Sequence, residues 1–196
     1  MDRAELIKLL EKYSRIEKAE DMFELDITGE TINNIDFSSY YLGLTWFMDN
    51  QFDSCTFHTT DLTDTNFNYS VFYNCKFSEN YILKADWNYV KFIHCSIVSL
   101  EAVRVCFFNI IMEDCEVKNS EFASCSFEPT KHKEDQEDGH FSKTVFRNCK
   151  FEVCHFANCV FDSVEFIGCT FTNTDIDTTN PSVHFTDCEF KTVPYK

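Results

Sequence analysis

The sequence predicts an all-β fold, a four-sided β-helix of about eight coils with a short helix at its N-terminal end. Two observations predict it: 20 of the 22 phenylalanines fall on a five-residue grid, and 10 of the 11 cysteines lie two residues before a grid position. The grid is unbroken from Ile32 to Phe127, resumes one residue out of register at 141–176, and shifts again before Phe185 and Phe190. A fixed short period of this kind is typical of a solenoid.

A period of five matches neither the helix period of 3.6 nor the strand period of 2. It does match a short strand followed by a corner. The large grid residue and the small residue two positions earlier point inward together, because alternate residues of a strand share a face. The residue between them points outward, and the last two turn the corner. We therefore expect a core built from paired large and small residues, including Phe57, Phe77, Phe92, Phe107, Phe127, Phe151, Cys55, Cys75, Cys95 and Cys115.

The cysteines indicate how many sides each coil has. Cys55, Cys75, Cys95 and Cys115 are spaced by 20 residues, so four pentads per turn would place them in one column. Each strand then pairs with the strand one turn away, and free edges remain only at the two ends of the rod. At about 4.8 Å per coil, eight coils make a rod of roughly 35–40 Å.

The pentad pattern resembles that of the pentapeptide-repeat family over residues 27–192. The resemblance implies a right-handed quadrilateral β-helix. Some members of the family are proposed to mimic DNA and to bind topoisomerases such as gyrase, protecting them from quinolones. The motifs that carry the resemblance are Cys55-Thr-Phe57, Asp61-Leu62, Cys75-Lys-Phe77, Ala85-Asp-Trp87, Cys149-Lys-Phe151, Cys169-Thr-Phe171 and Cys188-Glu-Phe190.

The domain organisation follows from where the grid begins and breaks. Residues 1–24 are expected to hold a capping helix over about 2–20, started by Asp2 with Glu5 three residues later. Its apolar stripe fits a lid over the first coil; a partner-binding helix is the alternative. Residues 25–196 form the β-helix, with a charged loop at 129–140 and a bulge at 178–181. The stripe consists of Leu6, Leu9, Leu10, Tyr13 and Ile16.

Charge and cysteine usage limit the partners and the compartment. A net charge of −16 and a pI near 4.6 disfavour nucleic acid and anionic membranes and favour basic protein surfaces. The acids are expected to be spread over the whole rod. Stacked cysteines point side by side, which is poor disulfide geometry, so we expect thiols and a cytoplasmic protein without a signal peptide. Cys106 faces outward in this scheme and is the best candidate for a reactive thiol.

No enzyme chemistry is predicted. The six histidines are scattered, the chain has four glycines and no glycine-rich phosphate loop, and no nucleophile motif is present. We expect no catalytic residue, no cofactor and no metal site, because a straight cysteine column does not converge on an ion.

Binding is therefore the predicted role, and the residues leave three hypotheses open. The first is an acidic DNA mimic that binds a gyrase-type topoisomerase or another DNA-binding protein. The second is a protein-interaction scaffold that uses an outward aromatic side and the 129–140 loop; the third is a stable rod whose binding is incidental. An apolar C-terminal end suggests a homodimer. The candidate partner-binding residues are Trp46, Met48, Tyr69, Tyr89, Phe108, Lys131, Glu134, Asp135, Glu137 and Asp138.

Overall fold

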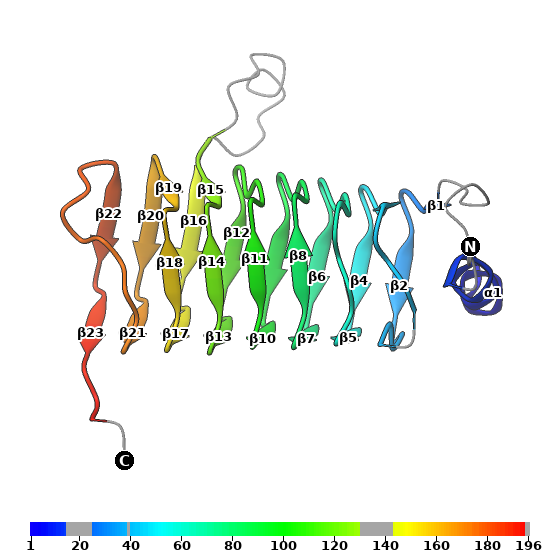
Figure 1. Ribbon diagram of the computed structural model, residues 1–196, viewed down its shortest axis with the longest axis horizontal. Helices are drawn as coiled ribbons and strands as arrows, with labels where there is room; N and C mark the ends of the chain where they lie inside the picture. Colours follow the sequence, from blue (N-terminus) through cyan, green and yellow to red (C-terminus); the bar gives the residue numbers. More distant parts are fainter. Residues whose placement is uncertain (15–24, 39, 130–142, 195–196) are drawn as a thin grey trace.

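The computed structural model describes residues 1–14, 25–38, 40–129 and 143–194 and shows a straight β-solenoid with one helix at its end (Figure 1). The helix, α1, spans Arg3–Ser14. The strands form parallel sheets along the four sides of the rod, and the longest sheet has eight strands, one from each coil. This arrangement confirms the predicted all-β fold of about eight coils.

The four sides are numbered in the order in which the chain visits them, starting from the side that contains β2. Sides 1 and 2 carry the longest sheets. Side 1 consists of β2 (Thr31–Asn33), β4 (Gln51–Asp53), β6 (Val71–Tyr73), β9 (Lys91–Ile93), β12 (Ile111–Glu113), β16 (Thr144–Arg147), β20 (Val164–Ile167) and β22 (Val183–Thr186). Side 2 consists of β5 (Thr56–His58), β7 (Lys76–Ser78), β10 (Ser96–Val98), β13 (Glu116–Lys118), β17 (Lys150–Glu152), β21 (Thr170–Thr172) and β23 (Glu189–Lys191).

Sides 3 and 4 have fewer strands and are completed by isolated β-bridges. The bridges between Asp61 and Tyr81 and between His155 and Asp175 extend side 3 at both ends. Side 3 consists of β8 (Tyr81–Leu83), β11 (Glu101–Val103), β14 (Glu121–Ala123) and β18 (His155–Ala157). Side 4 consists of β1 (Leu25–Asp26), β3 (Thr45–Trp46), β15 (Ser126–Phe127) and β19 (Val160–Phe161).

The register repeats every 20 residues, as the cysteine spacing predicts. Phe52 pairs with Phe72, and Phe72 pairs with Phe92. Across residues 129–140 the offset becomes 34, so that Met112 pairs with Phe146. The bulge changes the last offset to 19. The coil stack therefore continues across both interruptions, because the strands on either side of each one stay paired.

The core consists of aromatic stacks that run along the rod. The Phe37, Phe57 and Phe77 rings stack with centroid distances of 4.7 and 4.6 Å. Rings on neighbouring sides meet edge to face, as the Phe57 and Phe72 rings do at 6.0 Å. Aromatic pairs favour both geometries. All ten residues predicted for the core are buried.

The small inward residues of side 2 form the predicted cysteine column. Cys55, Cys75, Cys95 and Cys115 are buried, and each thiol donates to a backbone carbonyl of the preceding coil, at 3.4–3.7 Å. All eleven cysteines are free thiols. The column uses cysteine as a small apolar residue with one weak donor.

Nearly every pentad of the described coils turns its corner through one residue in the left-handed conformation. This residue lies two positions after the grid residue, with φ between +48° at Asn173 and +64° at Tyr69 among the non-glycine residues. Asparagine and aspartate tolerate this conformation better than most residues do. Val153 adopts it as well, with φ of +54°, although its side chain is β-branched.

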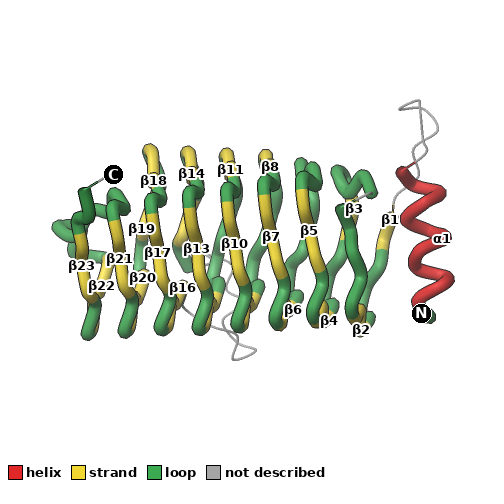
Figure 2. The backbone as a smooth tube through the Cα atoms, turned by 90° about the horizontal axis from the view of Figure 1, so that it is seen from below, coloured by secondary structure: helices red, strands yellow, loops and turns green. Residues whose placement is uncertain are grey.

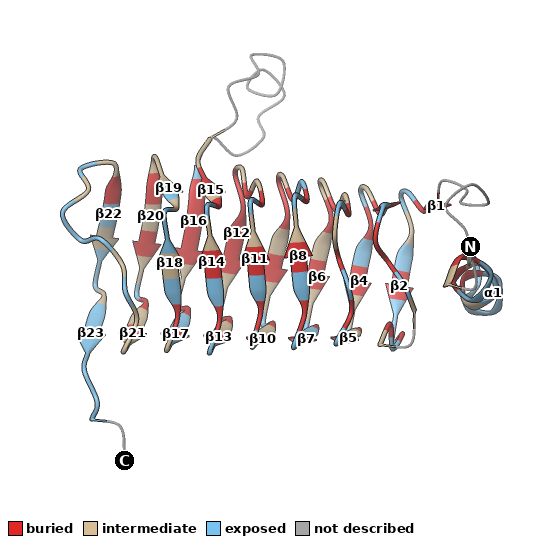
Figure 3. Ribbon diagram, viewed as in Figure 1, coloured by how far each residue is buried: buried red, intermediate tan, exposed pale blue. Residues whose placement is uncertain are grey.

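The two ends of the rod differ. Helix α1 lies across the first coil (Figure 2), with Leu6, Leu10 and Tyr13 buried, so it is placed as the predicted lid. Asp2 caps it through a 2.9 Å bond from the Glu5 N–H. The described helix ends at Ser14, before the predicted end at 20, and residues 15–24 lie outside the described part. At the opposite end, β22 and β23 are edge strands, and β23 is coloured as exposed (Figure 3).

Candidate protein-interaction surface

The outward side chains of the rod lie in columns. Residues just before and just after a grid residue point outward, and the same position in the next coil is 20 residues away. Tyr81 lies beside Glu101, for example, and Glu101 beside Glu121. Any surface of this rod is therefore a grid of columns about 4.8 Å apart along the axis.

The predicted aromatic residues of side 4 do not form one open surface. Trp46 is 43% exposed, whereas Met48, Tyr69 and Phe108 are half-buried. Tyr89 was expected to face solvent but is only 5% exposed, which corrects that expectation. Its ring lies flat on the Tyr69 ring, with centroids 4.9 Å apart and an angle of 4° between the planes. At this corner the two rings stabilise neighbouring coils.

A different set of apolar side chains is well exposed. Tyr41 is 39% and Tyr81 37% exposed on side 3, and Leu44 is exposed at the corner before Trp46. The pentad scheme places these residues outward. Exposed aromatic rings grouped in three successive coils exceed the scattered apolar residues that a soluble surface normally carries.

The remaining predicted partner-binding residues lie outside the described residues. These are five of the charged residues of the 129–140 loop, namely Lys131, Glu134, Asp135, Glu137 and Asp138. Their assignment stays a prediction.

The basic residues of the described coils are concentrated on two sides. The sequence pattern predicts acids spread over the whole rod and makes no prediction for the bases. Sides 1 and 2 carry Lys76, Lys91, Lys118, Lys143, Arg147, Lys150 and Lys191. On sides 3 and 4, Lys84 and Arg104 are the lysine and arginine residues of the described part. The acids of sides 3 and 4 are Asp26, Asp49, Asp61, Asp64, Asp86, Glu101, Glu121, Glu128, Asp162, Asp175 and Asp177.

Ion pairs follow the same division. On side 2, Lys150 pairs with Glu116 at 3.1 Å, and on side 1 Arg147 pairs with Glu113 at 2.9 Å. Lys143 pairs with Glu165 at 2.5 Å. Within the described residues, Asp61, Asp64, Asp86, Glu101 and Glu121 have no lysine or arginine partner. These five carboxylates lie on the two sides that carry few bases in the described coils, and we call the five residues the acidic surface.

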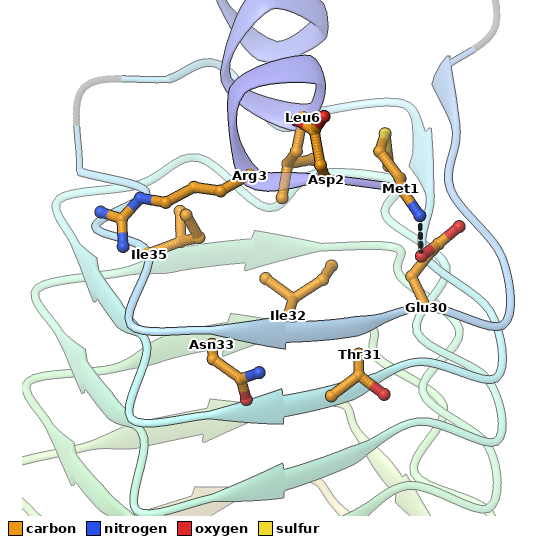
Figure 4. Close-up of a pocket in the computed structure, with 9 residues that line it drawn as sticks. All are labelled: Met1, Asp2, Arg3, Leu6, Glu30, Thr31, Ile32, Asn33 and Ile35. Atoms are coloured by element: carbon orange, nitrogen blue, oxygen red, sulfur yellow. Dashed lines mark hydrogen bonds and ion pairs between the residues drawn. The ribbon is translucent and has the colours of Figure 1, made fainter.

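A cavity of about 190 Å³ lies in the seam between α1 and the first coil (Figure 4). Leu6, Ile32 and Ile35 provide apolar walls, and Asp2 and Arg3 lie on its rim. The α-amino group of Met1 contacts Glu30 at 2.6 Å, which raises the pKa of that amine. The residues around this seam bring together no pair of groups suited to acid–base or nucleophilic chemistry.

The thiols of Cys106 and Cys154 are protonated at neutral pH. Cys106 was the predicted reactive thiol, but it is half-buried, and burial together with Asp86 raises its pKa to about 11. Burial likewise raises the pKa of Cys154 to about 11. A raised pKa leaves little thiolate at neutral pH. In the described residues no group of three or more His, Cys, Asp or Glu side chains could hold a metal ion, and no helix is long and apolar enough to cross a membrane.

The repeated coil has a counterpart in a known sequence family. Residues 140–176 match the family model for pentapeptide repeats, which describes eight copies. The chain carries pentapeptide repeats. No curated protein matches this pentapeptide-repeat chain in sequence.

Several solved structures are similar to the pentapeptide-repeat rod. QnrB1, a plasmid-mediated fluoroquinolone resistance protein, is 13% identical over 85% of this chain and 90% of that chain, with a TM-score of 0.33. HetL of the cyanobacterium Nostoc, involved in heterocyst differentiation regulation, is 9% identical over 96% and 94%, with a TM-score of 0.31. A pentapeptide-repeat protein of the Arabidopsis thaliana thylakoid lumen is 18% identical over 57% and 74%, with a TM-score of 0.34.

Proposed function

We propose that this pentapeptide-repeat rod is a non-enzymatic binding protein that presents its acidic surface to a DNA-binding protein. A gyrase-type topoisomerase is the first partner to test, since the chain resembles the DNA-mimicking members of its sequence family. The free thiols are consistent with action in a reducing compartment such as the cytoplasm.

The unneutralised carboxylates of sides 3 and 4 carry the proposal. Asp61, Glu101 and Glu121 occupy one column of side 3, and Asp64 and Asp86 lie beside it. Over the whole chain, −16 charges on a rod of roughly 38 Å give about 0.4 charge per Å, against about 0.6 for duplex DNA. A groove that binds DNA is basic, so such a surface would attract it at long range.

The acids also have a simpler role, because charge keeps a strand-rich rod soluble. Solubility requires net charge but no particular distribution of it. Seven of the nine lysines and arginines of the described coils lie on sides 1 and 2, so sides 3 and 4 carry the larger net negative charge, which is what a directional binding surface requires. The distribution therefore favours binding over solubility alone.

The test is a titration of gyrase and of topoisomerase IV with the rod at low and high salt, with duplex DNA as competitor. Binding should weaken at least tenfold between 50 and 200 mM salt, as the charges become screened. Neutralising Asp61, Glu101 and Glu121 together, as D61N/E101Q/E121Q, should weaken it further. The matched control E79Q/D114N/D187N removes the same charge from sides 1 and 2 and should bind nearly as the native chain does. Absence of binding at low salt, or equal losses in both triple variants, would refute the proposal.

A second candidate function, a salt-resistant adaptor, is favoured by the exposed Trp46 and its neighbour Leu44. Tryptophan is enriched in interface cores. Replacing Trp46 with serine would then abolish capture of a partner at high salt without unfolding the rod. Unchanged capture by this variant would exclude the adaptor role of this surface.

We also propose that a second copy of this chain pairs with the edge strand β23. Phe190 is 51% exposed there and stacks on Phe171 through one ring face only. The strand has the order Glu189, Phe190, Lys191. In an antiparallel pair centred on Phe190, each glutamate lies opposite the lysine of the other copy, so the strand complements itself about a two-fold axis.

A further inference from the structure

We propose that Tyr41, Asp61 and Tyr81, with Asp64 at the neighbouring corner, form a docking site for an arginine side chain in a basic segment of a protein partner. We call these four residues the tyrosine–aspartate site. The inference rests on the proposed acidic binding role and assigns that role an anchoring point. It is drawn from the exposed rings and free carboxylates described for side 3.

The three residues of the column occupy the same outward position in successive coils. A β-bridge pairs Asp61 with Tyr81, and Tyr41 lies one coil before Asp61. Coils are about 4.8 Å apart, so the backbones of the two tyrosines are about 10 Å apart, with Asp61 between them. The exposed Tyr81 ring therefore neighbours the Asp61 carboxylate on one outward face, so that a single flat cationic group can contact both.

The Tyr41 ring is held in place before any partner arrives. It packs beside the Tyr13 ring, with centroids 6.1 Å apart and an angle of 16° between the planes. Its backbone N–H donates to Ser14 Oγ at 2.9 Å, which ties it to the end of α1. The hydroxyl end of the Tyr41 ring lies against Gly43, so close that a Cβ atom on residue 43 would overlap the ring. A ring fixed in advance loses little conformational entropy on binding.

The carboxylates supply the opposite charge. Asp61 and Asp64 are exposed, and no lysine or arginine of the described residues forms an ion pair with either. One oxygen of Asp61 accepts the Thr63 N–H at 2.9 Å, which orients the carboxylate. Burial, and then the charges of Asp61 and Asp64, raise the pKa of Tyr41, so both acids act on its hydroxyl. The rings and the acids thus belong to one site.

Arginine fits this combination better than other groups do. Its guanidinium is planar, stacks on aromatic faces and donates to carboxylates in a fixed fork. Lysine lacks the flat face, nucleic acid is repelled by the acids, and an apolar anchor would leave the carboxylates unpaired. Lys84 lies at the corner one coil beyond Asp64, on the rim of the site. Lys84 is therefore expected to oppose an incoming cation.

The test uses a synthetic peptide of nine arginines, with a peptide of nine lysines as comparison, and measures binding to the full chain by calorimetry at low salt. The native chain should bind the arginine peptide several-fold more tightly. Asp61→Asn should weaken its binding about fivefold, and Tyr81→Leu about threefold. Asp187→Asn removes an exposed charge from side 1, away from the rings and outside the acidic surface, and Tyr73→Leu removes a half-buried ring from side 1. Both controls should stay within about twofold of the native chain.

Three further variants keep the result independent of folding. Tyr81→Phe retains the ring and should bind as the native chain does. Gly43→Ala should weaken binding by displacing the Tyr41 ring, and Lys84→Gln should strengthen it about twofold. Equal losses in Asp61→Asn and Asp187→Asn, an unchanged Tyr81→Leu, or equal affinity for both peptides would overturn the site. The topoisomerase titration tests the proposed function in a separate experiment. The tyrosine–aspartate site can therefore fail while topoisomerase binding is observed, and the reverse is also possible.

Discussion

At the scale of single residues, the corner of each pentad is the most demanding position. It requires a left-handed backbone in nearly every pentad, and glycine occupies it at Gly29 and Gly168. Most other corners carry polar residues whose side chains can bond to nearby backbone. Val153 departs from this pattern, since the residues at the same corner of the adjacent coils are Asn119 and Asn173.

Replacing Val153 with asparagine should therefore stabilise the rod by about 1 kcal/mol. The left-handed conformation costs most L-residues about 1–2 kcal/mol, and asparagine is among the exceptions. The midpoint of urea unfolding should rise accordingly. Asn158→Val, at a corner with φ of +54°, is the control and should lower it by a similar amount. A lower midpoint for Val153→Asn would show that the half-buried valine gains more from packing than it loses at the corner.

The sequence predicts inward residues well and corner residues poorly. An inward direction follows from the alternation of a strand, so Phe57 and Cys55 could be assigned to the core from spacing alone. A corner side chain leaves the strand, and its direction depends on the neighbouring coil. Tyr89 is buried against Tyr69 for this reason, and no sequence period indicates that contact.

At the scale of elements, the capping helix is attached by one buried polar contact. The Tyr13 hydroxyl donates to the Gly43 carbonyl at 2.7 Å, and the ring is 2% exposed. The apolar stripe and Asp2 predicted this helix and its start. The hydroxyl contact was not predictable, because it joins residues 30 positions apart across the end of the rod.

The attachment of helix α1 to the first coil should weaken at alkaline pH, because the Tyr13 hydroxyl loses its proton there. Burial raises the pKa of Tyr13 from 10.0 to about 12. A raised pKa in the folded chain means that the stabilisation is complete below pH 10 and is lost as the pH rises towards 12. The helical circular dichroism signal should fall in that window. Tyr13→Phe should remove this tyrosine's contribution to the pH dependence and destabilise the helix by about 1 kcal/mol at neutral pH. An unchanged pH profile in Tyr13→Phe would contradict the assignment.

The edge strand β23 offers a test by charge exchange. Lys191→Glu and Glu189→Lys should each abolish self-association in sedimentation velocity, because like charges would face each other in the antiparallel pair. The two single variants should associate with each other when mixed. The double variant, with both charges exchanged, should associate as the native chain does. A native chain that stays monomeric at every concentration, or association that ignores all these changes, would exclude the proposed pair.

At the scale of the whole molecule, charge differs between the four sides of the rod. The lysines and arginines of the described coils lie mostly on sides 1 and 2, and few lie on sides 3 and 4. The net charge and the assignment of residues to sides follow from the sequence. The pairing does not, because a lysine reaches a glutamate on its own or an adjacent coil only through its side-chain conformation. Lys118, for instance, lies 3.3 Å from Glu116 and 3.7 Å from Glu152. Which carboxylates are paired with a lysine or arginine therefore became visible only in three dimensions.

The unequal ends have a further consequence. Each coil contacts only the coil before it and the coil after it, so order is passed along the rod by nearest neighbours. Within the described residues, helix α1 covers the first coil, whereas the last coil pairs with a neighbour on one side only. We therefore expect fraying of the described rod to begin at that coil and to proceed coil by coil towards the helix. A partner that grips the early coils would hold the part of the rod that unravels last.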